Sequence, residues 1–291
     1  MMPRVPFLFL LLTAAAAPPL DAQVDPMALA KALTLHASFD SGVDADFALG
    51  DRRIHTAASY RNREDARPGL HHPDVSIVAG QGRFGGALQF RKKNTRAVYY
   101  PAEKNVAWRP RDWNGAVSFW LSLDPEQDLE PGFCDPIQVT AEAYNDAALW
   151  VDFTRDEKPR HFRLGVFGNL KAWNPQNLPA DKNPDFTRRL VAVTRPPFGR
   201  GRWTHVVITH AGLNTEAGGV ARLYLDGRLQ GAAEPIREPF TWDLKRAAIR
   251  LGVNYVGLFD DLALFDRALG DAEVRALHEM KSGVAALHGR K

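Results

Sequence analysis

Paired carboxylates are the first feature of this sequence with types and spacing suited to chemistry. The run Glu126-Gln127-Asp128-Leu129-Glu130 places acidic residues at alternate positions. Alternate positions share one face of a β-strand, and hydrolysis of a glycosidic bond with retention needs two carboxyl groups roughly 5–5.5 Å apart. Pro125 and Pro131 bracket the run, however, and proline is disfavoured inside a sheet. We therefore predict a charged surface loop here and a protein that is not an enzyme.

Tryptophan side chains are the second candidate, because aromatic rings can stack on the C–H faces of sugars. Trp120, Trp150 and Trp203 lie within or next to strand-like segments and are predicted to be core residues. The remaining ones lie in loop-like segments and are expected to be exposed. The predicted ligand-binding residues are Trp173, Asn174, Trp108, Trp113 and Trp242. The alternative is that these rings plug one end of the fold.

Other chemistries find little support in the sequence. The adjacent His71 and His72 point apart on an extended chain and form no zinc-binding pattern. Cys134 is the only cysteine, so no internal disulfide forms, and we expect a buried apolar filler. The net charge is +3 from 37 basic and 34 acidic residues, without long basic runs. We therefore predict no binding to nucleic acid.

Alternating apolar residues dominate the chain and predict β-strands, each with one buried face. Asp226-Gly227 separates two such runs and predicts a two-residue hairpin turn with positive φ at both residues. The sequence thus predicts an antiparallel β-sandwich. The clearest predicted strands are 33–39, 115–123, 137–140, 147–153, 162–167, 203–208, 221–225 and 259–265.

Two further segments have a distinct character. Residues 168–201 contain five prolines and form the longest stretch without a predicted element. Near the C-terminus, Val274, Leu277 and Met280 repeat at helical spacing, and Asp271 and Gly283 can begin and end a short helix. No linker divides the chain, so we predict a single domain over 33–282, with a tail at 283–291.

The N-terminal residues resemble a secretory signal peptide. Arg4 precedes an apolar run from Phe7 to Ala17, and cleavage is expected near Ala22. The run is shorter than the ~20 residues that span a bilayer as a helix, and no later segment is apolar for long enough. We predict a signal peptide over 1–22, a lead-in over 23–32, no transmembrane segment, and export to the periplasm, cell envelope or exterior.

Several motifs, in their order along the chain, resemble the laminin G-like or concanavalin A-like lectin/glucanase superfamily. They span roughly residues 33 to 280. The resemblance implies an all-β, concanavalin A-like antiparallel sandwich, or jelly roll, with a short C-terminal helix. The matching motifs are Phe39-Asp40, Gly85-Gly86-Ala87-Leu88-Gln89-Phe90, Val117-Ser118-Phe119-Trp120-Leu121, Trp203-Thr204-His205-Val206-Val207, Leu223-Tyr224-Leu225-Asp226-Gly227-Arg228, and 260–269.

The resemblance also implies a structural calcium ion between the first and last strands. Calcium takes six to eight oxygen ligands. In this sequence the corresponding ligands are Asp40, the backbone carbonyl of Gly86, and Asp261. The alternative is that Asp40 caps a turn and Asp261 forms a salt bridge.

For function, the resemblance implies recognition of a polysaccharide or another glycan by an exported, non-catalytic domain. Two alternatives remain. One is a glycoside hydrolase or lyase of the same superfamily that uses Glu126 and Glu130, like the Glu-x-Asp-x-Glu strand of retaining β-glucanases. The other is an adhesion module that binds a protein partner, because the same fold serves many functions.

Overall fold

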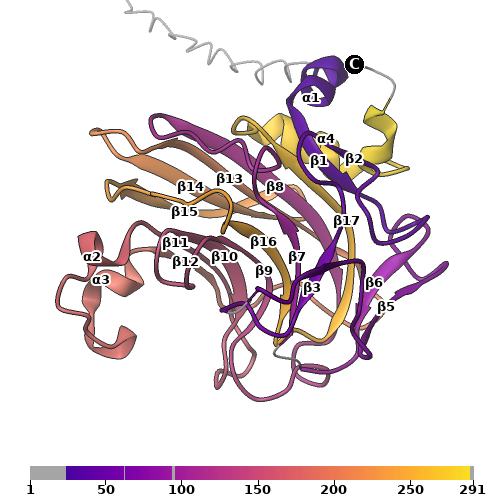
Figure 1. The fold of residues 1–291 in the computed structure, drawn as a ribbon, viewed down its shortest axis with the longest axis horizontal. Coiled ribbons are helices and arrows are strands. Elements are labelled where there is room, and N and C mark those ends of the chain that lie inside the picture. The colour runs from indigo at the N-terminus through magenta and orange to yellow at the C-terminus, as the bar shows by residue number, and fades with distance from the viewer. Residues whose placement is uncertain (1–23, 62, 94–95, 289–291) are drawn as a thin grey trace, which may run out of the picture.

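Two antiparallel β-sheets pack face to face and form the body of the protein (Figure 1). This computed structural model describes residues 24–61, 63–93 and 96–288. The predicted signal peptide lies outside the described residues. The mainly antiparallel sandwich confirms the fold class predicted from the alternating sequence.

The first sheet has nine strands, and its centre pairs β8 with β13 and β17. A short hairpin, β5 (Val75–Val78) and β6 (Ala87–Phe90), extends it beside β17. The order of the other strands is β15 (Arg228–Ile236), β14 (Gly219–Leu225), β13 (Thr204–Leu213), β8 (Trp113–Ser122), β17 (Gly257–Phe265), β1 (Leu33–Ala37) and β2 (Phe47–Ala48).

The second sheet has eight strands and includes the segments predicted around residues 137, 150 and 165. The order is β12 (Leu190–Val193), β11 (Phe162–Phe167), β10 (Ala148–Phe153), β9 (Cys134–Thr140), β16 (Ala248–Val253), β7 (Ala97–Pro101), β3 (His55–Ala57) and β4 (Arg67–Pro68).

The core lies between the two sheets and is built from the inward residue of each alternating pair. Phe119 on β8 stacks on Phe259 of β17 with ring centroids 4.9 Å apart. Cys134 is fully buried, as predicted, and burial raises its pKa to about 11. The predicted Asp226-Gly227 turn joins β14 to β15, with φ of 48° and 75°.

Short helices cover the outer face of the nine-stranded sheet: α1 (Pro26–Ala32), α4 (Asp271–Glu279) and the 3₁₀ turn η2 (Val284–Leu287). Val274 and Leu277 of α4 pack with Val207 and Tyr224 of the sheet. The predicted C-terminal helix is therefore confirmed. The predicted tail is, over its described part, a packed element, because Val284 and Leu287 are buried.

The segment 168–201 was expected to lack regular structure, and that expectation is wrong. It contains α2 (Leu170–Trp173), η1 (Ala180–Lys182), α3 (Pro184–Thr187) and β12. The prolines favour these elements, since Pro184 occupies the first turn of α3 and Asn183 caps it. In Figure 1, α2 and α3 lie at the end of the eight-stranded sheet, beside β11 and β12.

No helix in the described part of the chain is long and apolar enough to cross a bilayer.

Candidate functional site

The outer face of the eight-stranded sheet carries buried polar side chains in place of an apolar cover. In β9, β10, β11 and β16 the inward residues belong to the core, and the alternate residues point outward. The outward set includes one amide and three charged residues that are less than a tenth exposed, which is rare for charged residues unless they are paired. They are Asp135, Gln138, Asp152 and Arg250.

A β-bulge sets the position of Asp135. Between β9 and β10 the register shifts, so that Asp135 and Pro136 together oppose Asp152. Bulges re-aim a side chain and tolerate proline inside a strand. Asp135 therefore lies on the outer face, close enough to Asp152 for the charge on Asp152 to raise its pKa.

These carboxylates line a pocket of about 350 Å³, which we call the Trp150 pocket. Its walls combine aromatic rings from the sheet and its loops with residues of η1 and α3, and its floor is polar. A largely apolar pocket with a few convergent polar groups is typical of small-ligand sites. The lining residues are Phe133, Asp135, Gln138, Tyr144, Trp150, Asp152, Arg163, Ala180, Phe186, Val253 and Asn254.

Arg163 holds Asp152 in a two-point ion pair. Its Nε and a terminal nitrogen lie 2.8 and 2.5 Å from the two carboxylate oxygens. The guanidinium also lies over the rings of Phe133 and Trp150, 5.0 and 5.7 Å from their centroids. Burial alone would lower the pKa of Arg163, but its hydrogen bonds to Asp152 and the charges of nearby carboxylates together raise it. The pocket floor thus contains one neutralised charge pair.

Asp135 forms no ion pair with a cation among the described residues. Its Oδ2 accepts a hydrogen bond from the amide of Gln138. Burial and then the neighbouring Asp152 raise the pKa of Asp135 well above its usual value. Because Arg163 stabilises the charged form of Asp152, Asp135 is the member of the pair that keeps a proton more readily.

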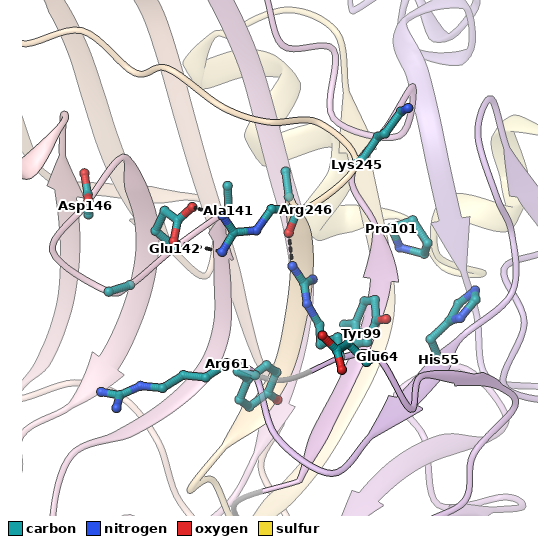
Figure 2. Close-up of a pocket in the computed structure, with 14 residues that line it drawn as sticks. His55, Arg61, Glu64, Tyr99, Pro101, Ala141, Glu142, Asp146, Lys245 and Arg246 are labelled. Atoms are coloured by element: carbon teal, nitrogen blue, oxygen red, sulfur yellow. Dashed lines mark hydrogen bonds and ion pairs between the residues drawn. The ribbon is translucent and has the colours of Figure 1, made fainter.

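A second, larger pocket of about 820 Å³ lies on the same face, and we call it the Tyr99 pocket (Figure 2). His55 stacks on the Tyr99 ring, with centroids 5.6 Å apart. The pocket is bordered by the loop around Arg61 and by two adjoining turns at one end of the sheet, which carry Glu142 and Arg246 (Figure 2). Its lining is rich in charged side chains of both signs.

A hydrogen-bonded chain connects the two pockets. Gln138 donates to Asp135 and accepts from Arg250 at 3.4 Å, and Arg250 donates to the backbone carbonyl of Glu142 at 2.8 Å. The carboxylate of Glu142 pairs with Arg246 in the Tyr99 pocket. Burial lowers the pKa of Arg250 to about 10, so it remains charged at neutral pH. The two pockets are therefore linked by a chain of polar side chains.

The tryptophans predicted to bind ligand are less exposed than expected. Trp113 lies within β8 and is fully buried, and Trp173 and Trp242 are also buried, so the expectation of exposure is wrong for these three. Trp108 is partly buried. The indole N–H groups of Trp108, Trp173 and Trp242 each donate to a backbone carbonyl of another residue, as buried tryptophans usually do.

Trp173 and Asn174 stabilise the segment beside the Trp150 pocket. The Trp173 ring packs against Phe167 and Phe186, and both polar atoms of the Asn174 side chain bond the backbone of Leu178. Trp150, predicted as core, is buried on the outer face and lines the pocket instead. The burial of Trp173 and Trp242 agrees with the alternative stated above, in which the loop tryptophans pack against the fold and do not bind a ligand.

Glu126 and Glu130 lie in the predicted surface loop between β8 and β9, and both are exposed. Glu126 accepts a hydrogen bond from the backbone N–H of Arg160. Glu130 accepts one from the backbone N–H of Lys93. They do not project from one strand into a cleft. The arrangement that the hydrolase alternative requires of these two residues is absent.

The three predicted calcium ligands are only partly brought together. Asp40 accepts a hydrogen bond from the backbone N–H of Gly86 at 2.7 Å. Asp261 instead accepts from His36 at 2.8 Å and from Val284, as in the salt-bridge alternative. Asp260, its neighbour, bonds the backbone N–H of Phe84 in the glycine-rich loop. Within the described residues, no three His, Cys, Asp or Glu side chains are arranged to hold a metal ion.

Sequence reasoning missed the Asp135–Asp152 pair, although one signal was available. Asp152, Arg163 and Arg250 each stand alone between two core residues of a strand. A single charge at an outward position of an otherwise buried strand indicates that this face is not simply solvated or apolar. Which of these charges meet across strands depends on register, including the bulge at Asp135.

A family profile described as Concanavalin A-like lectin/glucanases superfamily matches residues 114–275, more than half of the chain. The chain belongs to this superfamily. The matched range contains β8 to β17 and the start of α4, and so includes most of the Trp150 pocket. A search of curated proteins found no match.

Solved structures with similar folds include proteins bound to sugars. Domain 4 of AbnA, a GH43 extracellular arabinanase from Geobacillus stearothermophilus, in complex with arabinotriose, has a TM-score of 0.53 and 17% identity over 85% of this chain and 98% of that one. The ligand-binding domain of botulinum neurotoxin serotype D, in complex with N-acetylneuraminic acid, has a TM-score of 0.53 and 11% identity over 88% of this chain.

Trypanosoma rangeli sialidase has a TM-score of 0.51 and 15% identity over 87% of this chain. The chain spans 52% of the toxin structure and 34% of the sialidase. At these identities the similarity shows a shared fold.

Proposed function

We propose that this chain is an exported, non-catalytic glycan-binding protein whose ligand occupies the Trp150 pocket. The observation that carries the proposal is the pocket itself, in which aromatic walls enclose a polar floor. A sugar presents apolar C–H faces and hydroxyl groups, which such a lining can satisfy together. The sugar complexes of two proteins with this fold support the same class of ligand.

The residues of the Trp150 pocket contribute to glycan binding in different ways, according to their exposure. Tyr144 and Phe133 are 45% and 43% exposed, so their rings are accessible to a sugar ring. Asp135, Gln138 and Asn254 offer carboxyl and amide groups to hydroxyls. Trp150 is buried, donates its indole N–H to the carbonyl of Tyr144 at 2.6 Å, and so fixes the loop that carries Tyr144.

A glycan array followed by calorimetry on the positive sugar tests the proposal. We expect Tyr144→Ala and Asp135→Asn to weaken binding by about tenfold or more, since each removes a stacking or hydrogen-bonding group. Leu229→Ala is the matched control, because Leu229 is 48% exposed on β15 of the other sheet. Absence of binding to any glycan, or equal loss in the control, would contradict the proposal. Trp173→Ala is a poor test because it removes a buried ring.

The second candidate function is glycoside hydrolysis, and the Asp135–Asp152 pair favours it over Glu126 and Glu130. A protonated carboxyl beside an ionised one is the combination that a general acid and a base or nucleophile require. Here Asp135 would be the acid. Release of reducing ends from the bound glycan, abolished by Asp135→Asn, would favour this function over non-catalytic binding.

We also propose, from the resemblance, a structural calcium ion near Asp40 and Gly86. A thermal-shift titration with calcium chloride, and then with EDTA, tests this. Bound calcium is expected to raise the melting temperature as its concentration passes the dissociation constant. An unchanged melting temperature would contradict the proposal.

A further inference from the structure

The Tyr99 pocket has more cationic groups than its own acidic residues neutralise. Arg61, Arg63, Lys245 and Arg246 line it, together with three acidic side chains. Glu142 forms an ion pair with Arg246, with a nitrogen–oxygen distance of 2.8 Å. Asp146 accepts the backbone N–H of Leu170 at 2.8 Å at the start of α2.

Three of the four cations form no ion pair with a carboxylate among the described residues: Arg61, Arg63 and Lys245. Figure 2 shows Arg61 and Lys245 extending from opposite borders of the pocket. A groove that contains unpaired charges of one sign attracts ligands of the other sign.

Arg63 is the best-placed of these cations. Its guanidinium lies over the Tyr99 ring, 5.2 Å from the centroid, and one terminal nitrogen donates to the backbone carbonyl of Arg246. Burial lowers the pKa of Arg63, so its charge is partly desolvated, yet it remains an arginine cation. The remaining N–H groups of a fixed, planar guanidinium match a carboxylate or sulfate group.

From this geometry we infer that the Tyr99 pocket is a subsite for acidic groups, and that the ligand that spans the two pockets is an anionic glycan. The inference rests on the proposed glycan-binding function and specifies its ligand. One glycan chain would place a sugar ring in the Trp150 pocket and a carboxylate or sulfate on Arg63. The polar chain through Gln138 and Arg250 lies beneath both positions.

An acidic glycan fits this groove better than a nucleic acid does. Binding to a nucleic acid backbone requires many phosphate contacts by lysine and arginine, whereas this pocket also holds Glu64, Glu142 and Asp146. Those acidic side chains repel a densely charged polymer but allow an isolated anionic group beside Arg63.

Calorimetry on the full chain with matched ligands tests the inference. One pair is a hexameric oligogalacturonate and its methyl-esterified form, which has the same backbone without the charge. A sulfated galactan oligosaccharide separates sulfate from carboxylate recognition, and single-stranded DNA of similar charge serves as the polyanion control. The variants are Arg63→Met, Arg63→Lys and, as a matched control, Arg228→Met on β15 of the other sheet, where Arg228 is exposed.

We expect at least one acidic oligosaccharide to bind. Loss of its charge, or Arg63→Met, should weaken binding by about tenfold or more, while Arg228→Met changes it less than about twofold. Arg63→Lys should retain part of the affinity, since it keeps the charge but loses the two-point contact. Circular dichroism and melting temperature confirm that each variant is folded.

Other results would overturn the inference. The acidic subsite is contradicted if neutral glycans bind and the acidic ones do not, or if Arg63→Met binds the acidic oligosaccharide with normal affinity. Either result leaves the proposed glycan-binding function supported. If DNA binds as tightly as the acidic glycans, the groove recognises polyanions in general. If no glycan of either kind binds, both proposals fall.

Discussion

The outer faces of the two sheets differ although the sheets share one core. On the nine-stranded sheet the outward residues Val207, Ala263 and Phe265 are apolar and are covered by α1, α4 and η2. On the eight-stranded sheet the outward residues are charged or aromatic and line two pockets. A covered apolar face contributes stability, whereas a face with pockets and buried polar groups can bind a ligand.

Both faces nevertheless contain buried titratable groups, and the partners differ. His205, on the covered face, forms a hydrogen bond with Ser118 at 2.8 Å and contacts the rings of Trp120 and His278, which also stack on each other. Asp152, on the pocket face, is paired with a cation, and Asp135 is not. Substitutions on each face should therefore separate stability from binding.

The largest expected effect comes from breaking the charge pair on the pocket face. Arg163→Ala leaves the buried Asp152 without its cation, so we expect a loss of about 3–5 kcal/mol in the free energy of unfolding, measured by urea denaturation. The double variant Asp152→Leu/Arg163→Met should lose much less, because no charge stays buried. Equal losses in both variants would contradict the assigned role of the pair.

On the covered face, Leu277→Ala should lower the free energy of unfolding by about 3 kcal/mol, because Leu277 packs under α4 against the sheet. Glycan affinity should not change, since the pockets lie on the other sheet. Glu279→Ala on the exposed side of the same helix should change stability by less than about 0.5 kcal/mol. A loss of binding in Leu277→Ala would show that the two faces are coupled.

His205 should make the covered face sensitive to acid. Burial lowers its pKa to about 3, while the unfolded chain titrates near 6.5. The unfolded state therefore binds more protons between these values, and stability falls as pH decreases, on the order of 2–3 kcal/mol from pH 6.5 to 4. Stability measured over this range should decrease less steeply in His205→Gln.

Asp135 should have the opposite pH dependence on the pocket face. Its pKa is raised by burial and by Asp152, so the folded state keeps the proton to higher pH than the unfolded state does. Its effect is to lower stability as pH rises above its unfolded value of 3.8. Asp135→Asn should melt at a higher temperature than the wild type at pH 8, with the difference shrinking towards pH 4. A lower melting temperature at pH 8 would contradict this.

The smallest expected effect on stability is that of an exposed pocket residue. Tyr144→Ala should change the free energy of unfolding by less than about 0.5 kcal/mol while weakening glycan binding. The backbone carbonyl that accepts the Trp150 indole N–H is retained in this variant. A large stability loss would indicate that Tyr144 supports the fold more than it serves the site.

Most strands could be predicted from the sequence because alternation reports directly on burial. The runs around Val117, Leu149, Leu164 and Ile208 each lie in one strand, and these four residues belong to the core. The Asp226-Gly227 turn followed from local backbone preference. The segment 168–201 was misjudged, because its short helices depend on packing of Trp173 and Phe186 against β11.

The site was much less predictable than the strands. Loop position indicated exposure for Trp113 and Trp242, yet both rings pack together, with centroids 4.8 Å apart. The residues that line the pockets were assigned to the core or left out. Exposure of a large aromatic ring depends on contacts with distant segments, which local sequence does not encode.

The sequence by itself determined the alternating strands, the hairpin, the terminal helix and membership of one superfamily, because each depends on neighbours within a few residues. Only the tertiary structure decided that Asp135 lies near Asp152, and that Arg63 lies over Tyr99 and forms no ion pair with any carboxylate in the described part of the chain. Those contacts depend on the register between strands and on a one-residue bulge. A shift of one position would send the same side chains to the opposite face of the sheet.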